Sequence, residues 1–253
     1  MSKDLLIYII YHKNTYPENT SSFSDLELRK HFVWVAVNES ILKIEDKWIP
    51  SECLVKEWEL NTYLPLLQMS NFYQNSVFFH LYWNKDLLKS KYIGFAQYDM
   101  NFSSVENRNI FRMIENDVGD KVFGSYPYNF QAIYGILTKP MWEEYFLNPY
   151  NEYYNTSHSF NDIEDIPLFL LHTFIIPKWF FLHMMGFVEK MYIGILRALQ
   201  WNTRHLAGTM ERVFALCISF GIKENKFRLV TQWDGVNHID TQRVSDPFRG
   251  IIS

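Results

Sequence analysis

The stretch YIGFAQYDM, residues 92–100, decides the fold of this 253-residue chain. Its apolar first half contains a glycine and an alanine, which allow close packing, and this pattern predicts a buried strand of an α/β sheet. The strand ends abruptly in Gln97, Tyr98 and Asp99. Because ligands of α/β sheets bind outside the carboxyl ends of the strands, Asp99 is the first candidate for a binding site.

The rest of the chain alternates between strand and helix patterns. Further strands are predicted at 5–10, 32–37, 131–137 and 227–233, where apolar residues run together. Helices are predicted within 57–83, near 110–115, at 141–146, from Pro177 to about residue 199, and at 206–220 with Gly221 as a left-handed cap. Loops are predicted at 14–24, 103–128 and 148–165. The alternation predicts a parallel α/β sheet with right-handed crossovers.

Composition narrows the classes of protein that fit. The net charge is −4 and there is no long basic block, so nucleic acid is not an expected partner. Cys53 and Cys217 lie far apart among apolar neighbours, which indicates buried thiols in a reducing compartment such as the cytoplasm. Aromatic residues make up 18% of the chain, a richness that suits sugar rings and nucleobases but equally suits a packed core.

The apolar segment 166–201 is interrupted by charged and histidine side chains, so we do not expect it to span a membrane. It fits a helix that packs internally, forms the face of a homodimer, or rests on a membrane surface. The N-terminal apolar run is too short for a signal peptide.

Polar residues at two other places are candidates for the same site. Tyr11, His12 and Lys13 follow the first predicted strand, where an aromatic ring can stack on a base and a lysine can meet a phosphate; solvent-facing polar residues are the plainer interpretation. Glu211 and Arg212 lie in the first turns of a late helix. Glu211 suits a general base, or simply the positive end of the helix dipole, and Arg212 suits a phosphate or carboxylate.

A divalent metal is compatible with Asp99. A carboxylate that holds Mg²⁺ or Mn²⁺ leaves coordination positions for phosphate oxygens and water, although a carboxylate that merely caps a loop explains Asp99 as well. His238 is a second candidate ligand near the C-terminus, with a solvated tail as the alternative. Gln97 stands where a second carboxylate of an Asp-x-Asp motif is usual.

The order of these motifs resembles a glycosyltransferase family of bacterial and viral capsule and surface-polysaccharide gene clusters. The first strand, which ends in YHK, resembles the family's ATHK-like strand, and YIGFAQYDM resembles its YIGLCHYRRYF strand. Matching residues are His12 and Lys13 in the first motif, Tyr92, Ile93, Gly94 and Tyr98 in the second, and Arg204, Gly208, Glu211 and Arg212 in a late helix. Gln97 and Asp99 replace a His and an Arg of the family pattern.

This resemblance implies an α/β fold of the GT-A type with a mainly helical C-terminal portion. Residues 1–253 would then form one glycosyltransferase domain, with a nucleotide-binding part at 1–137 and an acceptor-side helical part at 138–253. The implied site places Tyr11, His12, Lys13, Gln97, Tyr98 and Asp99 at the nucleotide, Asp99 and His238 at a tentative Mn²⁺ or Mg²⁺ ion, and Glu211 and Arg212 at the reaction.

The resemblance also implies a function. The chain is expected to move a sugar from a nucleotide-diphosphate donor to a hydroxyl of a carbohydrate or glycolipid acceptor in polysaccharide or glycan synthesis. The aromatic segment 142–154 is expected to form the acceptor wall and a lid. The alternatives are a non-catalytic carbohydrate-binding or structural surface protein, which needs no carboxylate at the strand end, and a nucleotidyltransferase.

Overall fold

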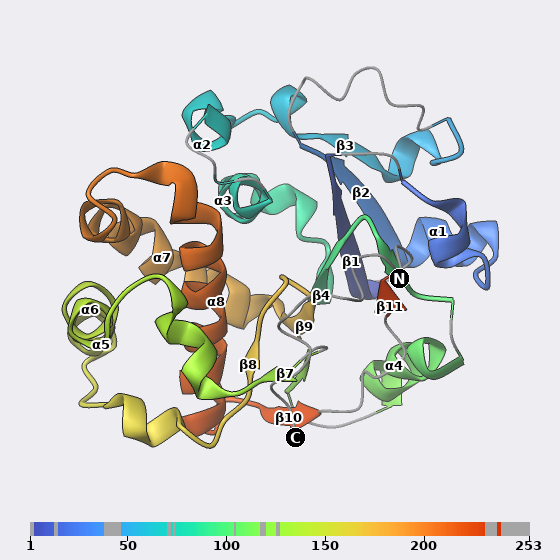
Figure 1. Ribbon diagram of the computed structural model, residues 1–253. Helices are drawn as coiled ribbons and strands as arrows, with labels where there is room; N and C mark the ends of the chain where they lie inside the picture. The colour runs from blue at the N-terminus through green and yellow to red at the C-terminus, as the bar shows by residue number, and fades with distance from the viewer. Residues whose placement is uncertain are drawn as a thin grey trace.

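A seven-stranded sheet runs through the middle of the protein (Figure 1). The computed structural model describes residues 3–12, 15–37, 47–69, 72, 74–103, 105–116, 120–124, 127–230 and 237–238. From one edge to the other the strands are β10 (Arg228–Val230), β6 (Lys121–Gly124), β9 (Phe174–Pro177), β4 (Ser90–Gln97), β1 (Lys3–Tyr11), β2 (Phe32–Ala36) and β3 (Leu54–Lys56). Neighbours pair in parallel except β9, which runs antiparallel to both β4 and β6.

Helices cover both faces of the sheet (Figure 1). One face carries α3 (Asn75–Trp83), α7 (Lys178–Ala198) and α8 (Leu206–Lys223), and the other carries α1 (Asp25–His31) and α4 (Val105–Asn116). Shorter elements are α2 (Pro65–Met69), α5 (Lys139–Trp142), a π-helical turn (Glu143–Leu147), α6 (Asn148–Tyr154), and strand pairs β5 (Met100–Asn101) with β11 (Asn237–His238) and β7 (Pro127–Tyr128) with β8 (Leu168–Phe169). The C-terminal part is mainly helical, as predicted.

Alternation along β1 divides the interior into two cores. Leu6, Tyr8 and Ile10 pack with the helices α3, α7 and α8, whereas Leu5, Ile7, Ile9 and Tyr11 join the core under α1 and α4. Successive side chains of a strand point to opposite faces, so a strand that is apolar throughout requires a cover on each side. The sheet is therefore buried on both faces around β1 and β4.

Aromatic rings fill the larger of these cores. Phe78 of α3 stacks between Phe95 of β4 and Phe214 of α8, with centroid distances of 4.3 and 4.5 Å. Much of the aromatic richness is thus structural, as one interpretation of the composition allowed.

The close-packing prediction for residues 92–100 is confirmed. A Cβ atom on Gly94 would lie 2.9 Å from Cγ1 of Ile175 in β9 and 3.1 Å from Cγ1 of Ile7 in β1. Ordinary carbon contacts need about 3.5–4.0 Å. Glycine at this position therefore lets β4 sit between β1 and β9 with both neighbours in contact.

Two predictions within residues 103–137 are wrong. Residues 131–137 form no strand, because Phe130–Gly135 is a 3₁₀ helix whose carbonyl groups accept hydrogen bonds from side chains: Arg212 Nε to Ala132 O at 2.9 Å and Trp142 Nε1 to Ile133 O at 3.1 Å. The strand of this region is β6, inside the predicted loop 103–128, and all four of its residues are buried.

The predicted loop and lid at 148–165 contains α6 and a 3₁₀ turn (Phe160–Ile163). Trp142, Phe146 and Tyr150 are buried in the core, so these rings do not form an acceptor wall. Helix α8 continues through Gly221, which is no left-handed cap; a Cβ there would lie 2.6 Å from the ring of Phe227.

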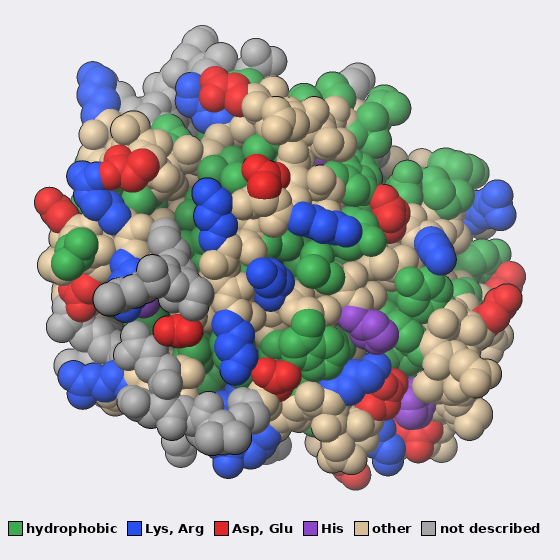
Figure 2. Space-filling view, turned by 180° about the vertical axis from the view of Figure 1, so that it is seen from behind, with side chains coloured by type: hydrophobic (Ala, Val, Ile, Leu, Met, Phe, Trp, Pro, Cys, Tyr) green, Lys and Arg blue, Asp and Glu red, His purple; other side chains and the backbone are tan. Residues whose placement is uncertain are grey.

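The surface carries both signs of charge. On the face seen in Figure 2, Lys and Arg side chains lie among Asp and Glu side chains with hydrophobic residues between them. Cys53 and Cys217 are buried free thiols, as predicted. Within the described part of the chain, no helix is both long enough and apolar enough to cross a bilayer.

Candidate active site at the carboxyl edge of the sheet

The ends of β1 and β4 bring two of the sequence motifs together. Ile10 pairs with Gln97 across the parallel strands, and the imidazole of His12 meets the ring of Tyr98 edge-on at a centroid distance of 5.2 Å. Asn19 fixes the same turn, since its Nδ2 donates to the carbonyl of Tyr98 at 2.6 Å. His12 is half-buried, which leaves part of its ring at the surface beside Tyr98.

Tyr11 does not belong to this surface. Its side chain is 0% exposed and packs in the core under α1 and α4. Leu5, Ile7 and Ile9 face that core as well, and the strand extends to Tyr11, one residue further than predicted. Tyr11 therefore offers no ring face to a base, and Lys13 lies outside the described residues.

The two predicted metal ligands come from adjacent backbone segments. Asp99 directly precedes β5, and β11 pairs with β5 so that His238 lies opposite Met100. Asp99 itself is 1% exposed, and the side chain of His238 is outside the described part of the structure. No group of three or more His, Cys, Asp or Glu residues suited to a metal ion occurs among the described residues.

A turn that no sequence motif indicated joins Gln97 to Glu211. The amide of Leu171 donates to Oε1 of Glu211, and the carbonyl of Leu171 accepts from Nε2 of Gln97 at 3.2 Å. This turn leads into β9, whose antiparallel direction puts its first residue, Phe174, beside Phe95 of β4. The carboxylate of Glu211 in α8 is thus linked through Leu171 to the carboxyl end of β4.

The turn holds a strained backbone. Leu171 and His172 both adopt left-handed conformations, with φ of 61° and 48°. Such conformations cost about 1–3 kcal/mol each in residues other than glycine and concentrate at functional sites, where surrounding contacts hold them. Here those contacts come from Gln97, Glu211 and the hydroxyl of Thr173, which donates to the carbonyl of Leu171 at 3.0 Å.

His172 ties the turn to two helices. Its Nε2 donates to Oδ1 of Asn75 at 2.6 Å, and Nδ2 of Asn75 donates in turn to the carbonyl of Ala207 at 3.2 Å. Burial lowers the pKa of His172 to about 3, because a charged imidazole would lose its hydration there. A neutral histidine therefore links the turn to the starts of α3 and α8.

Arg212 contacts the 3₁₀ helix Phe130–Gly135 and the first turn of α8. Its guanidinium donates to the carbonyls of Ala132, at 2.9 Å from Nε, and of Gly208, at 2.8 Å from Nη1. A Cβ on Gly208 would lie 3.4 Å from Nη1, so the glycine gives the guanidinium room. Burial lowers the pKa of Arg212, with Glu211 acting in the opposite direction.

Sequence reasoning missed His172, Asn75 and Asn19, all buried polar residues. Their signal was weak because each makes its contacts across the fold rather than within a motif. For His172 one signal existed: it lies two residues before the buried run Phe174–Pro177, and identification of that run as a strand would have placed His172 near a strand end.

Known proteins resemble this chain in structure and not in sequence. No family model matches it, and no curated protein matches it significantly. The apo structure of WbbM, a bifunctional glycosyltransferase, superposes with a TM-score of 0.60 and 11% identity over 90% of this chain and 44% of WbbM. The chain therefore spans less than half the length of WbbM.

Two other solved structures are less similar. The mannosyltransferase Ktr4p from S. cerevisiae has a TM-score of 0.41 and 14% identity over 86% of this chain and 66% of its own, and mouse xyloside xylosyltransferase 1 has 0.35 and 11% over 89% and 84%. At 11% identity the likeness to WbbM concerns the fold. The chain shares the α/β fold of this glycosyltransferase, which confirms the predicted GT-A type fold class with its mainly helical C-terminal portion.

Proposed function

We propose that this protein transfers a sugar from a nucleotide-diphosphate donor to a hydroxyl group of a carbohydrate acceptor. The observation that carries the proposal is the junction of Gln97, Leu171 and Glu211 at the carboxyl end of β4. Through this junction the half-buried carboxylate of Glu211 lies beside the carboxyl end of β4, and this is the sheet edge at which α/β folds bind nucleotides. The fold shared with a glycosyltransferase supports the same reaction class.

In this proposal the donor lies along the ends of β1 and β4. The half-buried ring of His12, which packs on the buried ring of Tyr98, lies nearest the base. Lys13 meets a phosphate, and Gln97 and Asp99 lie nearest the diphosphate. The contact between His12 and Tyr98 and the pairing of Ile10 with Gln97 support this grouping.

Glu211 is the proposed general base for an inverting transfer. It takes the proton of the acceptor hydroxyl while the hydroxyl oxygen bonds to the anomeric carbon and the bond to the diphosphate breaks, which releases a nucleoside diphosphate. A positioned base of this kind contributes about 10²–10⁴-fold to the rate. Arg212 is proposed as a positioning residue, because its hydrogen bonds tie the start of α8 to Phe130–Gly135.

The proposed site also includes a divalent cation. Mg²⁺ is commonly held by one or two carboxylates together with substrate phosphates and water, so Asp99 and His238 suffice as protein ligands. The pairing of β5 with β11, which sets His238 opposite Met100, supports this pair. The ion would neutralise charge on the leaving diphosphate.

A thermal-shift screen with nucleoside diphosphates, with and without Mn²⁺, tests the proposal. We expect one nucleoside diphosphate to raise the melting temperature and Asp99→Asn to abolish that rise. Glu211→Gln keeps an oxygen that can accept from the amide of Leu171, so we expect it to bind the nucleotide normally but to release nucleoside diphosphate from nucleotide sugars about 10²–10⁴-fold more slowly.

The exposed Glu164 provides the matched control, and Glu164→Gln is expected to behave as the unmodified protein. Stabilisation by free glycans alone would replace the transferase with a carbohydrate-binding protein, and stabilisation by nucleoside triphosphates alone would indicate a nucleotidyltransferase. Full activity in Glu211→Gln would reject Glu211 as the base.

A further inference from the structure

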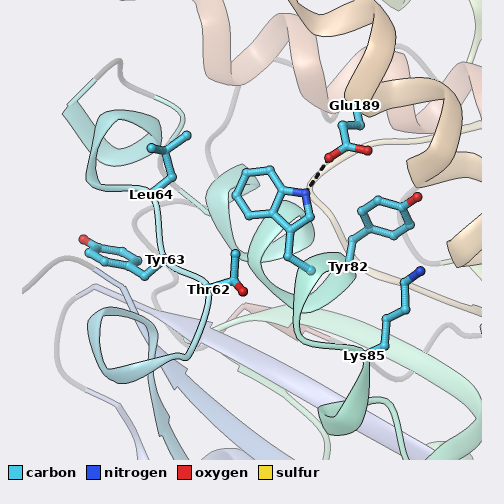
Figure 3. A pocket seen from close by; sticks show the side chains of 7 residues that line it. Thr62, Tyr63, Leu64, Tyr82, Lys85 and Glu189 are labelled. Carbon is cyan, nitrogen blue, oxygen red and sulfur yellow. Dashed lines mark hydrogen bonds between the residues drawn. The ribbon is translucent and has the colours of Figure 1, made fainter.

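Two cavities lie on either side of α7. The larger, of about 570 Å³, is walled by Thr62–Leu64 on one side, by Tyr82, Trp83 and Lys85 on another, and by Glu189 of α7 (Figure 3). The smaller, of about 300 Å³, lies between α6 and α7, and Tyr153 and Lys190 line it. Both combine aromatic rings with a few charged groups, the composition that is typical of ligand sites.

The two cavities approach each other over Gly186. A Cβ atom on this residue would lie 3.0 Å from the hydroxyl of Tyr153 and 3.7 Å from the hydroxyl of Tyr82. Glycine inside a helix costs roughly 1 kcal/mol relative to alanine. Its presence here lets the hydroxyl groups of Tyr82 and Tyr153 lie close to the backbone of α7, which brings a lining residue of each cavity to the same point of the helix.

The aromatic rings on both sides carry a cation in the same arrangement. Nζ of Lys85 lies 4.9 Å from the centroid of Tyr82, and Nζ of Lys190 lies 4.7 Å from that of Tyr153. Each half of the surface therefore offers a ring beside an ammonium group.

Trp83 and Glu189 hold each other in place at the centre of the larger cavity. The indole Nε1 donates to Oε1 of Glu189 at 2.6 Å, the bond that is dashed in Figure 3. The figure also shows Tyr63 and Tyr82 on opposite sides of the cavity. An indole fixed by its own hydrogen bond keeps a preferred orientation before any ligand arrives, which lowers the entropy cost of binding.

The outer wall is fixed by buried polar groups of α3. The amide of Leu64 donates to Nε2 of His80 at 2.9 Å, while Nδ1 of His80 donates to the fully buried Glu57. Asn84 exchanges hydrogen bonds with the backbone of Thr62, at 3.1 Å to its amide and 2.8 Å to its carbonyl. Buried polar networks of this kind are costly unless fully satisfied, and they make the wall rigid.

This surface is separate from the candidate active site. Tyr82, Trp83 and Lys85 stand where α3 leads into the first residue of β4, Ser90, which is the amino edge of the sheet. Gln97 lies at the other end of that strand. A sugar bound here would therefore not be the sugar that reacts.

We propose that the two cavities form one groove across α7 that binds several sugar units of an oligosaccharide chain. The apolar faces of the pyranose rings lie on Trp83, Tyr82 and Tyr153, and their hydroxyl groups meet Glu189, Lys85 and Lys190. The choice of a carbohydrate as the ligand rests on the proposed function, whose acceptor is a carbohydrate; the groove itself rests on the contacts above.

Nuclear magnetic resonance of the ¹⁵N-labelled protein tests this groove. The indole signal of Trp83 is identified by its loss in Trp83→Phe, and the probes are the hexasaccharides of maltose, cellulose, mannan, chitin and xylan together with their monosaccharides. We expect at least one hexasaccharide to shift this signal. Tyr153→Ala should weaken the binding of that hexasaccharide by about tenfold and leave the binding of its monosaccharide unchanged, because only the longer ligand crosses α7.

The control is Trp201→Ala, since Trp201 is 61% exposed and lines neither cavity. It should leave hexasaccharide binding unchanged. A Trp83 signal that no hexasaccharide moves, or an affinity that Tyr153→Ala leaves intact, overturns the groove. If the hexasaccharide binds and no nucleotide does, the groove stands and the transferase fails; nucleotide binding with no hexasaccharide response gives the opposite result.

Discussion

Among individual residues, His172 makes the strongest link between the turn at Leu171 and the helices beneath it. Its pKa falls from 6.5 to about 3 on burial. Between these two values the unfolded chain binds a proton that the folded chain does not, so the free energy of unfolding decreases as the pH falls from about 6.5 towards 3. The stabilising neutral form is fully present above the upper value.

We expect this residue to contribute up to about 1.4 kcal/mol of lost stability per pH unit in that window. Urea unfolding from about pH 7 to about pH 4 measures the slope, and His172→Gln should reduce it by this amount while lowering stability by a constant at neutral pH. Parallel pH curves for the two proteins would show that His172 does not titrate in this way.

Among the helices, two glycines test packing against intrinsic propensity. Alanine favours a helix by about 1 kcal/mol over glycine, but a Cβ on Gly221 in α8 would lie 2.6 Å from Phe227 and 2.9 Å from Phe180. Overpacking costs about 1–3 kcal/mol, so we expect Gly221→Ala to destabilise the protein by on the order of 1 kcal/mol.

Gly194 in α7 is the matched control, because its Cβ would meet nothing nearer than Tyr145 at 3.9 Å. We expect Gly194→Ala to stabilise the protein by up to about 1 kcal/mol. Chemical denaturation measures the free energy of unfolding of both variants. An increase in both would mean that the rings of Phe227 and Phe180 move to accommodate a Cβ at residue 221 at little cost.

At the scale of the whole chain, the two predicted parts at 1–137 and 138–253 both contribute strands to one sheet. Strand β9 lies between β4 and β6, and β10 is the other neighbour of β6. Without residues beyond 137, β6 has neither neighbour, and the core over α3 lacks α7 and α8.

We therefore expect a fragment of residues 1–137 to show no cooperative thermal transition by circular dichroism, whereas the full chain shows one. Cooperative melting of the fragment, together with a dispersed amide spectrum, would mean that the N-terminal part is an independent unit.

Local patterns in the sequence predict β1, β2, β4, α3, α7 and α8, because continuous apolar runs specify the strands, and helical spacing and helix-end residues specify the helices. Strands β6 and β9 have four residues each, and they are strands because of the partners beside them. A four-residue apolar run does not by itself distinguish a strand from a buried helical segment.

The candidate site divides in the same way. The sequence predicts Gln97 and Asp99 as site residues because they lie at the end of a recognisable strand. It predicts Glu211 as a site residue because Glu211 lies in the first turns of a recognisable helix. The connection of Gln97 to Glu211 through Leu171 was not predictable, since it depends on the antiparallel direction of β9. Tyr11 was misplaced because β1 extends one residue beyond its predicted end.

The turn at Leu171 also bears on how such a site changes during evolution. Gln97 and Glu211 both bind main-chain atoms of residue 171, so neither contact depends on which side chain stands there. Selection would act on tolerance of a left-handed conformation, which glycine and asparagine meet more easily than leucine. Homologues can therefore keep the junction with another residue at this position, provided that the residue tolerates the left-handed conformation, and glycine or asparagine are the replacements that we expect in aligned sequences.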